Sequence, residues 1–204
     1  MDLFGNDPVA NFLPCDGTVN YLGPIFSPEE SDHLFENLLL EIPWKHDESV
    51  MFGKRIITAR KVAWYGDSSF SYTYSGTTKQ ALAWTDKLAE LRSVVENLAG
   101  STFNSCLLNL YHDGSEGMGW HSDDERSLSK DSAIASVSLG AERIFRFKHK
   151  DTGQALSILL EHGSLLVMKG STQRHWLHCI PKSKKIHSSR INLTFRTMSE
   201  GMDC

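Results

Sequence analysis

Short strands separated by turn residues fill the chain from residue 101 onward, and this pattern limits the fold more than any other feature. The expected strands lie at 104–111, 133–139, 143–149, 155–160, 164–168, 175–179 and 190–197. Short strands at such intervals are typical of an all-β sandwich or barrel. A chain of 204 residues has room for one such domain with a lid, whereas two full domains would be cramped.

Two helices are expected outside this β region. The first follows the capping box Ser27-Pro28-Glu29-Glu30 and ends before Pro43. The second runs from near Thr78 to about Leu98, where a glycine follows. Residues 1–26 are expected to be irregular, and glycine-containing turns between the helices suggest hairpins. The predicted fold class is therefore α+β, with two helices backing a β-barrel.

Charge and composition exclude several classes of protein. Lysine and arginine number 21 against 25 aspartates and glutamates, a net charge of −4 that excludes a generally basic nucleic-acid coat protein but not a local basic groove. The 4 cysteines show no CxxC spacing, which favours free thiols in an intracellular chain. No signal peptide or membrane-spanning run is visible. We expect no membrane contact and a cytoplasmic protein, or a nuclear one in a eukaryote, that is not secreted.

Polar and apolar side chains alternate along the last expected strand. One face carries Arg190, Asn192, Thr194 and Arg196, and the other carries Ile191, Leu193 and Phe195. Asn109 and Tyr111 share a face in the same way. Alternation alone leaves two interpretations open. The polar face is either exposed to solvent or lines a cavity for a charged small-molecule cofactor.

His121 and Asp123 lie two residues apart, so in an extended segment both side chains point the same way and can share a metal ion. His175 and His178 are candidates for a third ligand. Two histidines and a carboxylate with open positions form the facial triad of non-haem Fe(II) oxygenases, although a zinc hydrolase can use the same set. Arg190, further along the chain, could hold a dicarboxylate through a bidentate pair.

Five segments together resemble a known family. They are Leu108-Asn109-Leu110-Tyr111, His121-Ser122-Asp123-Asp124-Glu125, Ala135-Ser136-Val137-Ser138-Leu139-Gly140, His175-Trp176-Leu177-His178-Cys179-Ile180-Pro181 and Arg190-Ile191-Asn192-Leu193-Thr194-Phe195-Arg196. The chain resembles, over about residues 15–198, the AlkB-type Fe(II)/2-oxoglutarate dioxygenases that remove alkyl groups from nucleic-acid bases. It is most similar to the branch that repairs duplex DNA.

The resemblance implies a double-stranded β-helix (jelly-roll) core and an N-terminal nucleotide-recognition lid in a single domain, 1–204. The lid would cover about 45–77 and the core about 101–198. The implied catalytic iron ligands are His121, Asp123 and His178. The residues implied to hold 2-oxoglutarate are Asn109, Tyr111, Arg190, Asn192, Thr194 and Arg196. Fe(II), 2-oxoglutarate and O2 are the implied cofactors, with Arg190 on the distal carboxylate of 2-oxoglutarate.

The resemblance also implies the residues that contact the substrate: Phe52, Gly53, Arg60, Tyr72, Tyr74, Asp124 and Glu125. Tyr72 and Tyr74 would enclose the extruded base, and Phe52 would fill the gap that the base leaves. Arg60 would contact phosphate or the opposite strand. Asp124 and Glu125 would lie beside a cationic methylated base or its exocyclic amine.

The implied function is DNA repair by oxidative demethylation of N1-methyladenine and N3-methylcytosine. The reaction would be coupled to 2-oxoglutarate decarboxylation and would release formaldehyde, succinate and CO2. The expected partner is alkylated DNA, single- or double-stranded, with RNA as a further substrate, and the expected oligomeric state is a monomer. Two alternatives stay open: a related dioxygenase acting on RNA or protein, and a non-catalytic nucleic-acid-binding module of the same fold.

Overall fold

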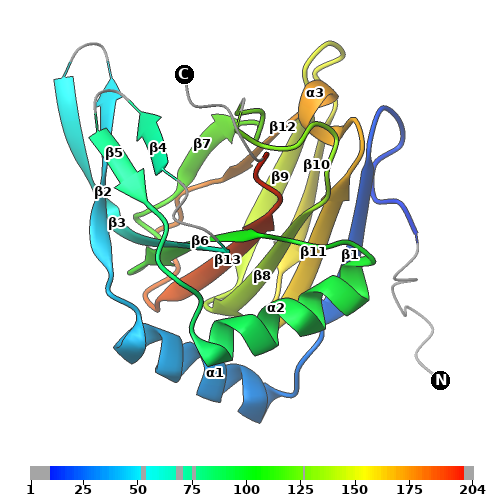
Figure 1. Ribbon diagram of the computed structural model, residues 1–204. Coiled ribbons are helices and arrows are strands. Elements are labelled where there is room, and N and C mark those ends of the chain that lie inside the picture. The colour runs from blue at the N-terminus through cyan, green and yellow to red at the C-terminus, as the bar shows by residue number, and fades with distance from the viewer. Residues whose placement is uncertain (1–9, 52–53, 68–70, 75–76, 126, 200–204) are drawn as a thin grey trace.

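A computed structural model describes residues 10–51, 54–67, 71–74, 77–125 and 127–199 (Figure 1). The larger sheet has the strand order β1 (Thr18–Pro24), β11 (Ser164–Lys169), β8 (Ile134–Gly140), β13 (Arg190–Arg196), β6 (Ser105–Tyr111), β3 (Lys54–Gly66) and β2 (Lys45–Met51). The smaller sheet has the order β10 (Ala155–Leu160), β9 (Arg143–His149), β12 (Trp176–Ile180) and β7 (Met118–His121). A hairpin joins β4 (Ser71–Tyr74) to β5 (Thr77–Gln80).

The larger and the smaller sheet face each other and share a core between them, which is the arrangement of a jelly roll. Tyr111 and Leu166 of the larger sheet pack in the same buried cluster as Phe145, Phe147 and Ile180 of the smaller sheet. The paired strands run antiparallel, and β12 pairs with both β9 and β7. The predicted fold class, an α+β chain with a jelly-roll core, is confirmed.

Two helices, α1 (Pro28–Glu41) and α2 (Asp86–Ala99), cover the outer face of the larger sheet (Figure 1). Their buried side chains, including Leu38, Leu88 and Val95, pack in one cluster with Leu108 and Leu193 of the strands beneath. A capping box between Ser27 and Glu30 begins α1, as predicted from the sequence. Among the described residues, no helix has the length and apolar character needed to cross a bilayer.

Two expectations about secondary structure were wrong. The second helix begins at Asp86 rather than near Thr78, because Thr77–Gln80 pairs with β4 and the Thr85 side chain caps the helix on the Leu88 amide. The N-terminal segment is not wholly irregular. It contains β1, which pairs with β11 and buries alternate residues such as Val19. Strand pairing decided both cases, in a local hairpin for Thr77–Gln80 and with a distant strand for β1.

The polar face of β13 lies between the two sheets rather than in solvent. Ile191, Leu193 and Phe195 pack under the helices, so alternation turns Arg190, Asn192 and Thr194 toward the smaller sheet. These three polar residues are all buried. The interpretation that alternation alone left open is therefore resolved in favour of an enclosed polar face.

Cys15, Cys106 and Cys179 are free thiols, as the lack of CxxC spacing predicted, and Cys204 lies outside the described residues.

Candidate active site

Strand register brings two histidines together on the inner face of the smaller sheet. His121 ends β7 and lies opposite His178 of β12, and their ring centroids are 4.2 Å apart. Asp123 follows two residues later, with Oδ1 3.7 Å from His121 Nε2. The ligand atoms of the three side chains all lie within 4.8 Å of one another. This donor set matches a facial triad for a divalent metal ion.

The surroundings of the two imidazoles suit metal binding. His121 Nδ1 lies 2.9 Å from the Gly119 carbonyl oxygen, which only accepts, so Nδ1 carries the proton and Nε2 is free for a metal. Burial lowers the pKa of His178 to about 3, so this ring is neutral near pH 7. Phe145 stacks on the His178 ring at 5.3 Å and fixes its plane.

Asp123 is ionised although it is only 7% exposed. Burial alone would raise the pKa of this carboxyl group, but Arg196 opposes that effect with Nη2 2.9 Å from Oδ2, and the net pKa is below the ordinary value. The same pair raises the pKa of Arg196 against its own desolvation, with help from Glu125. Arg196 therefore stabilises the charged form of a metal-ligand carboxylate.

His175, the other candidate ligand, lies elsewhere. It stacks on His149, 6.2 Å away, in a second group of possible ligands with Asp151, and His149 also belongs to a further group with Cys15 and Asp16. His149 Nδ1 accepts the backbone N–H groups of Asp151 and Thr152, so Nε2 holds the proton and donates to Asp16. A nitrogen that donates has no lone pair for a metal, and the second group is therefore the poorer site.

The inner faces of β13 and β8 form a polar network around Arg190. Its Nη2 donates to Ser138 Oγ at 2.9 Å and to Asn192 Oδ1 at 2.6 Å, and Asn192 Nδ2 donates to Thr194 Oγ1 at 2.7 Å. The Arg190 guanidinium also lies 5.5 Å from the centre of the Tyr111 ring. Arg190, Asn192, Thr194 and Tyr111, predicted separately from the sequence, are thus brought together.

Arg190 is a buried cation that lacks an anion. Its Nε and Nη1 have no hydrogen-bond partner among the described residues, nor does Asn109 Oδ1, and no carboxylate there pairs with Arg190. Burial lowers its pKa to about 10, so it stays charged near pH 7. A buried unpaired charge is strongly unfavourable. The residues therefore fit a bound carboxylate, and Arg190 has free donors to grip it.

Arg143, which the sequence did not single out, is the contrasting case. It is equally buried, but its guanidinium donates to the carbonyl oxygens of Glu116 at 2.8 Å, Pro181 at 2.9 Å and Asp113 at 3.4 Å. Arg143 thus ties the β6–β7 connection to the end of β12, and it lies 5.8 Å from the Tyr111 ring. Of the two buried arginines, Arg190 is the one with donors left for a ligand.

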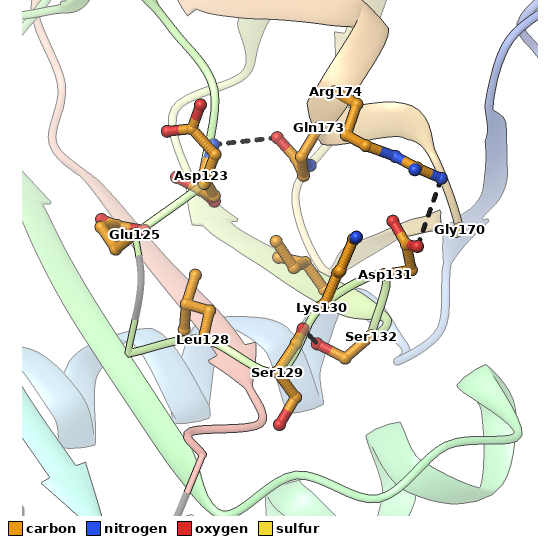
Figure 2. A pocket seen from close by; sticks show the side chains of 12 residues that line it. Asp123, Glu125, Leu128, Ser129, Lys130, Asp131, Ser132, Gly170, Gln173 and Arg174 are labelled. Atoms are coloured by element: carbon orange, nitrogen blue, oxygen red, sulfur yellow. Dashed lines mark hydrogen bonds and ion pairs between the residues drawn. The ribbon is translucent and has the colours of Figure 1, made fainter. Parts of the chain in front are cut away.

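A cavity of about 380 Å³ lies directly beside Asp123 (Figure 2). Asp123 and Glu125 form one wall, residues 128–132 form the floor, and Gln173 and Arg174 lie opposite; Asp124 also lines the cavity. Asp124 Oδ2 accepts from Ser122, and Glu125 Oε1 is 4.0 Å from Arg196 Nη1. The carboxylates give this wall a negative character next to the candidate metal site.

The remaining predicted substrate residues fall within residues 45–77. Tyr72 and Tyr74 lie on β4, and Phe52 and Gly53 lie outside the described residues. The Arg60 side chain is 11% exposed and pairs with Asp47 at 2.6 Å. Arg60 thus ties β3 to β2, and this use competes with the predicted contact to phosphate.

Comparison with known proteins agrees with this geometry. The sequence model of the 2OG-Fe(II) oxygenase superfamily matches residues 18–196. Human DNA oxidative demethylase ALKBH2 is 41% identical over 198 residues, covering 92% of this chain and 74% of that protein. The chain belongs to the AlkB family of 2OG-Fe(II) oxygenases. The bovine α-ketoglutarate-dependent dioxygenase alkB homolog 3 is 39% identical, covering 83% of this chain and 62% of that protein.

One solved structure of the AlkB family supports the fold independently. The structure of OsALKBH1 superposes with a TM-score of 0.62, covering 92% of this chain and all of that one, at 17% sequence identity. At that identity the likeness concerns the jelly roll alone. Membership of the family implies Fe(II), 2-oxoglutarate and O2 as cofactors, which agrees with the metal-ligand set and the unpaired Arg190.

Sequence reasoning missed three side chains that support this AlkB-type site. On β8, Ser136 donates to Asn192, and Ser138 accepts from Arg190. The alternation of these serines with Ala135 and Val137 was the sequence pattern that could have predicted a second polar strand face. Gln173 accepts the backbone N–H of Asp123, and no local pattern could have linked positions 50 residues apart.

Proposed function

We propose that this protein is an Fe(II)- and 2-oxoglutarate-dependent DNA oxidative demethylase that restores N1-methyladenine and N3-methylcytosine in alkylated DNA. The observation that carries the proposal is a two-part site: a His-Asp-His ligand set at the smaller sheet, and on the larger sheet a buried arginine that has no anionic partner among the described residues. The relatives named DNA oxidative demethylase support DNA as the substrate.

The residues present fit the metal ion. His121, Asp123 and His178 would hold Fe(II), which with 2-oxoglutarate and O2 supplies the oxidation of the N-methyl carbon, yielding formaldehyde, succinate and CO2. The protein contributes the imidazoles of His121 and His178 and one carboxylate kept ionised by Arg196. This set neutralises half of the charge of the ion and leaves positions open for the co-substrates.

The residues around Arg190 would orient 2-oxoglutarate. Arg190 would pair with the distal carboxylate, because its free Nε and Nη1 are donors in a dry site where a charge-assisted pair is strong. Asn109, Tyr111, Asn192 and Thr194 would line the same cleft, and Arg196 would lie near the metal-chelating end.

The acidic wall of the cavity suits a methylated base. N1-methyladenine and N3-methylcytosine carry positive charge, which Asp124 and Glu125 would favour electrostatically beside the metal site. The lid at about 45–77 would supply Tyr72 and Tyr74 to stack on the extruded base, and the core at about 101–198 would supply the chemistry. Arg60 serves first to brace the lid through Asp47.

The proposal is tested by formaldehyde and succinate release from oligonucleotides with one N1-methyladenine. Purified protein would be assayed with Fe(II), 2-oxoglutarate and ascorbate on matched single-stranded DNA, duplex DNA and RNA. We expect both products together with restored adenine on DNA, and none from Asp123→Ala, which removes a metal ligand. Succinate without demethylation would mean that the substrate is different, and normal turnover by Asp123→Ala would overturn the ligand set.

The preference for duplex DNA depends on the lid. We expect Phe52→Ala to lower turnover on duplex DNA at least several-fold more than on single strands, because an apolar wedge replaces the stacking of an extruded base. The same oligonucleotide pair measures both rates. Equal losses on the two substrates would mean that Phe52 has a structural role.

A further inference from the structure

One hydrogen bond links the metal-ligand loop to a distant short helix. The backbone N–H of Asp123 donates to Gln173 Oε1 at 2.9 Å, as the dashed line in Figure 2 shows. Asp123 belongs to a segment after β7 that has no ladder hydrogen bonds of its own. Its carboxylate is held by Arg196, and its main chain is held by Gln173. The position of the Asp123 ligand atoms therefore depends on both contacts.

The Gln173 side chain is itself fixed at both ends of its amide group. While Oε1 accepts from Asp123, Nε2 contacts Met168 Sδ at 3.3 Å. The backbone oxygen of Gln173 accepts from Lys150 Nζ at 2.9 Å. An acceptor held in this way constrains its partner more than a mobile side chain does, because little rotamer freedom remains to be lost.

Gln173 lies on α3 (Thr172–His175), and the N-terminal segment packs against this helix. The Thr172 hydroxyl accepts the backbone N–H of Thr18 at 2.9 Å and lies 2.6 Å from the Lys169 carbonyl oxygen. A Cβ atom at Gly17 would come within 2.8 Å of that hydroxyl, so the two segments are in close contact. Trp176 Nε1 donates to the Cys15 carbonyl oxygen at 3.1 Å.

The same short helix thus determines the positions of two metal ligands. It leads directly into β12, which carries His178, and it reaches Asp123 through the Gln173 amide. We propose that Gln173 is a positioning residue that presets the Asp123 carboxylate for the metal ion and thereby sets metal affinity. The inference rests on the proposed function, because it takes His121, Asp123 and His178 as the Fe(II) ligands.

Metal affinity of the metal-free protein tests this inference without any turnover. Co²⁺ would be titrated into wild type, Gln173→Met and Gln173→Glu, with the absorbance of bound Co²⁺ as the signal. Methionine keeps the length and helix propensity of glutamine but lacks the acceptor, whereas glutamate restores an acceptor oxygen. We expect a 10- to 100-fold loss of affinity in Gln173→Met, the usual effect of losing an outer partner of a metal ligand. Gln173→Glu should stay within about threefold of wild type.

Arg174→Ala is the matched control. Arg174 lies on the same helix, but its guanidinium points away to Asp131 at 3.2 Å (Figure 2), so this variant should bind Co²⁺ like wild type. Melting temperatures of all variants would separate misfolding from loss of the hydrogen bond. Equal affinity in Gln173→Met and wild type, or equal losses in Gln173→Met and Gln173→Glu, would overturn the inference.

A separate outcome would concern the ligand set itself. If Asp123→Ala binds Co²⁺ as tightly as wild type, then Asp123 is not a ligand, and the proposed function fails. If Asp123→Ala loses Co²⁺ while Gln173→Met retains it, the proposed function stands and only the positioning role of Gln173 fails. Amide hydrogen exchange at Asp123 supplies a second readout, and it should become faster in Gln173→Met.

Discussion

At the scale of single residues, Arg143 and Arg190 show how hydrogen-bond partners separate a structural from a ligand-binding role. Both are 1% exposed, and both lie over the ring of Tyr111. Three carbonyl oxygens satisfy Arg143, whereas Nε and Nη1 of Arg190 have no partner in the part of the chain that the structure describes. The two side chains should therefore respond oppositely to the same substitution.

We expect Arg143→Met to lower the free energy of unfolding by about 3 kcal/mol, because it leaves buried carbonyl groups without donors. Arg190→Met should leave the ligand-free protein within about 1 kcal/mol of wild type, since it removes an unpaired buried charge. It should raise the KM for 2-oxoglutarate at least tenfold with little change in DNA affinity. Urea unfolding and steady-state kinetics measure these effects. Loss of DNA binding with an unchanged KM for 2-oxoglutarate would contradict the role of Arg190.

The buried imidazole of His178 makes a second prediction, about pH. Burial lowers its pKa to about 3 in the folded chain, against about 6.5 when unfolded. Between these pH values the unfolded chain binds a proton that the native chain does not. The free energy of unfolding of metal-free protein should therefore fall as pH falls from about 6.5, by up to about 1.4 kcal/mol per pH unit. Above that pH the contribution of His178 to this slope is absent.

The prediction is checked by urea unfolding of metal-free wild type and His178→Gln between pH 4.5 and 7. This window avoids most of the titration of Asp123, whose pKa is lower than usual. Wild type should lose stability more steeply than the variant toward acid pH. If the free energy of unfolding depended on pH equally in wild type and His178→Gln, then His178 would gain a proton as easily in the folded chain as in the unfolded one.

At the scale of elements, Asp67 anchors the strand that leads to the β4–β5 hairpin. Its carboxylate accepts from Trp84 Nε1 at 2.6 Å and pairs with Arg92 of α2, and its N–H donates to the Asn104 carbonyl. Arg92 also lies 4.7 Å from the Trp84 ring. This cluster attaches one end of the hairpin segment of the proposed lid to α2.

We expect Asp67→Ala to raise the KM for a methylated oligonucleotide by about 3- to 10-fold, because losing charge-assisted hydrogen bonds of about 1.5–3 kcal/mol loosens this end of the lid. The KM for 2-oxoglutarate should not change. Glu41→Gln is the control, since it breaks an ion pair with Lys87 on the exposed helices that contributes little. A rise in both KM values of Asp67→Ala would indicate damage to the whole domain.

The elements also show how much of the fold could be predicted from the sequence. Strands β6 and β8–β13 lie within a few residues of their expected positions, because alternation and turn residues are local signals. The existence of β1 depends on pairing with the distant strand β11, which leaves no local mark, whereas the start of α2 is set by the short hairpin strand β5 and the Thr85 cap that precede it. The same limit applies to the site. Alternation predicts that Arg190 and Asn192 share a face of their strand. It does not predict that this face is buried, because the burial depends on the smaller sheet that lies opposite.

At the scale of the whole molecule, the jelly roll separates the two halves of the site. His121 and His178 belong to the smaller sheet, whereas Arg190 belongs to the larger one. A bound co-substrate that chelates the metal at one end and pairs with Arg190 at the other would join the two sheets across the core. Ligand binding should therefore contribute to the stability of the whole domain and not only to the order of the site.

Mn²⁺ and 2-oxoglutarate together should raise the melting temperature more than Mn²⁺ alone. A ligand that binds only the folded chain at 100 times its Kd adds about 2.7 kcal/mol, or about 5–10 °C for a chain of this size. Thermal unfolding followed by circular dichroism measures both increments. In Arg190→Met the increment from 2-oxoglutarate should fall to about half or less, because a tenfold weaker ligand at the same concentration adds only about 1.4 kcal/mol, while that from Mn²⁺ stays. In Asp123→Ala both should disappear, because the metal that the keto-acid chelates is lost. An undiminished increment from 2-oxoglutarate in Arg190→Met would place the co-substrate elsewhere and contradict a ligand that spans the two sheets.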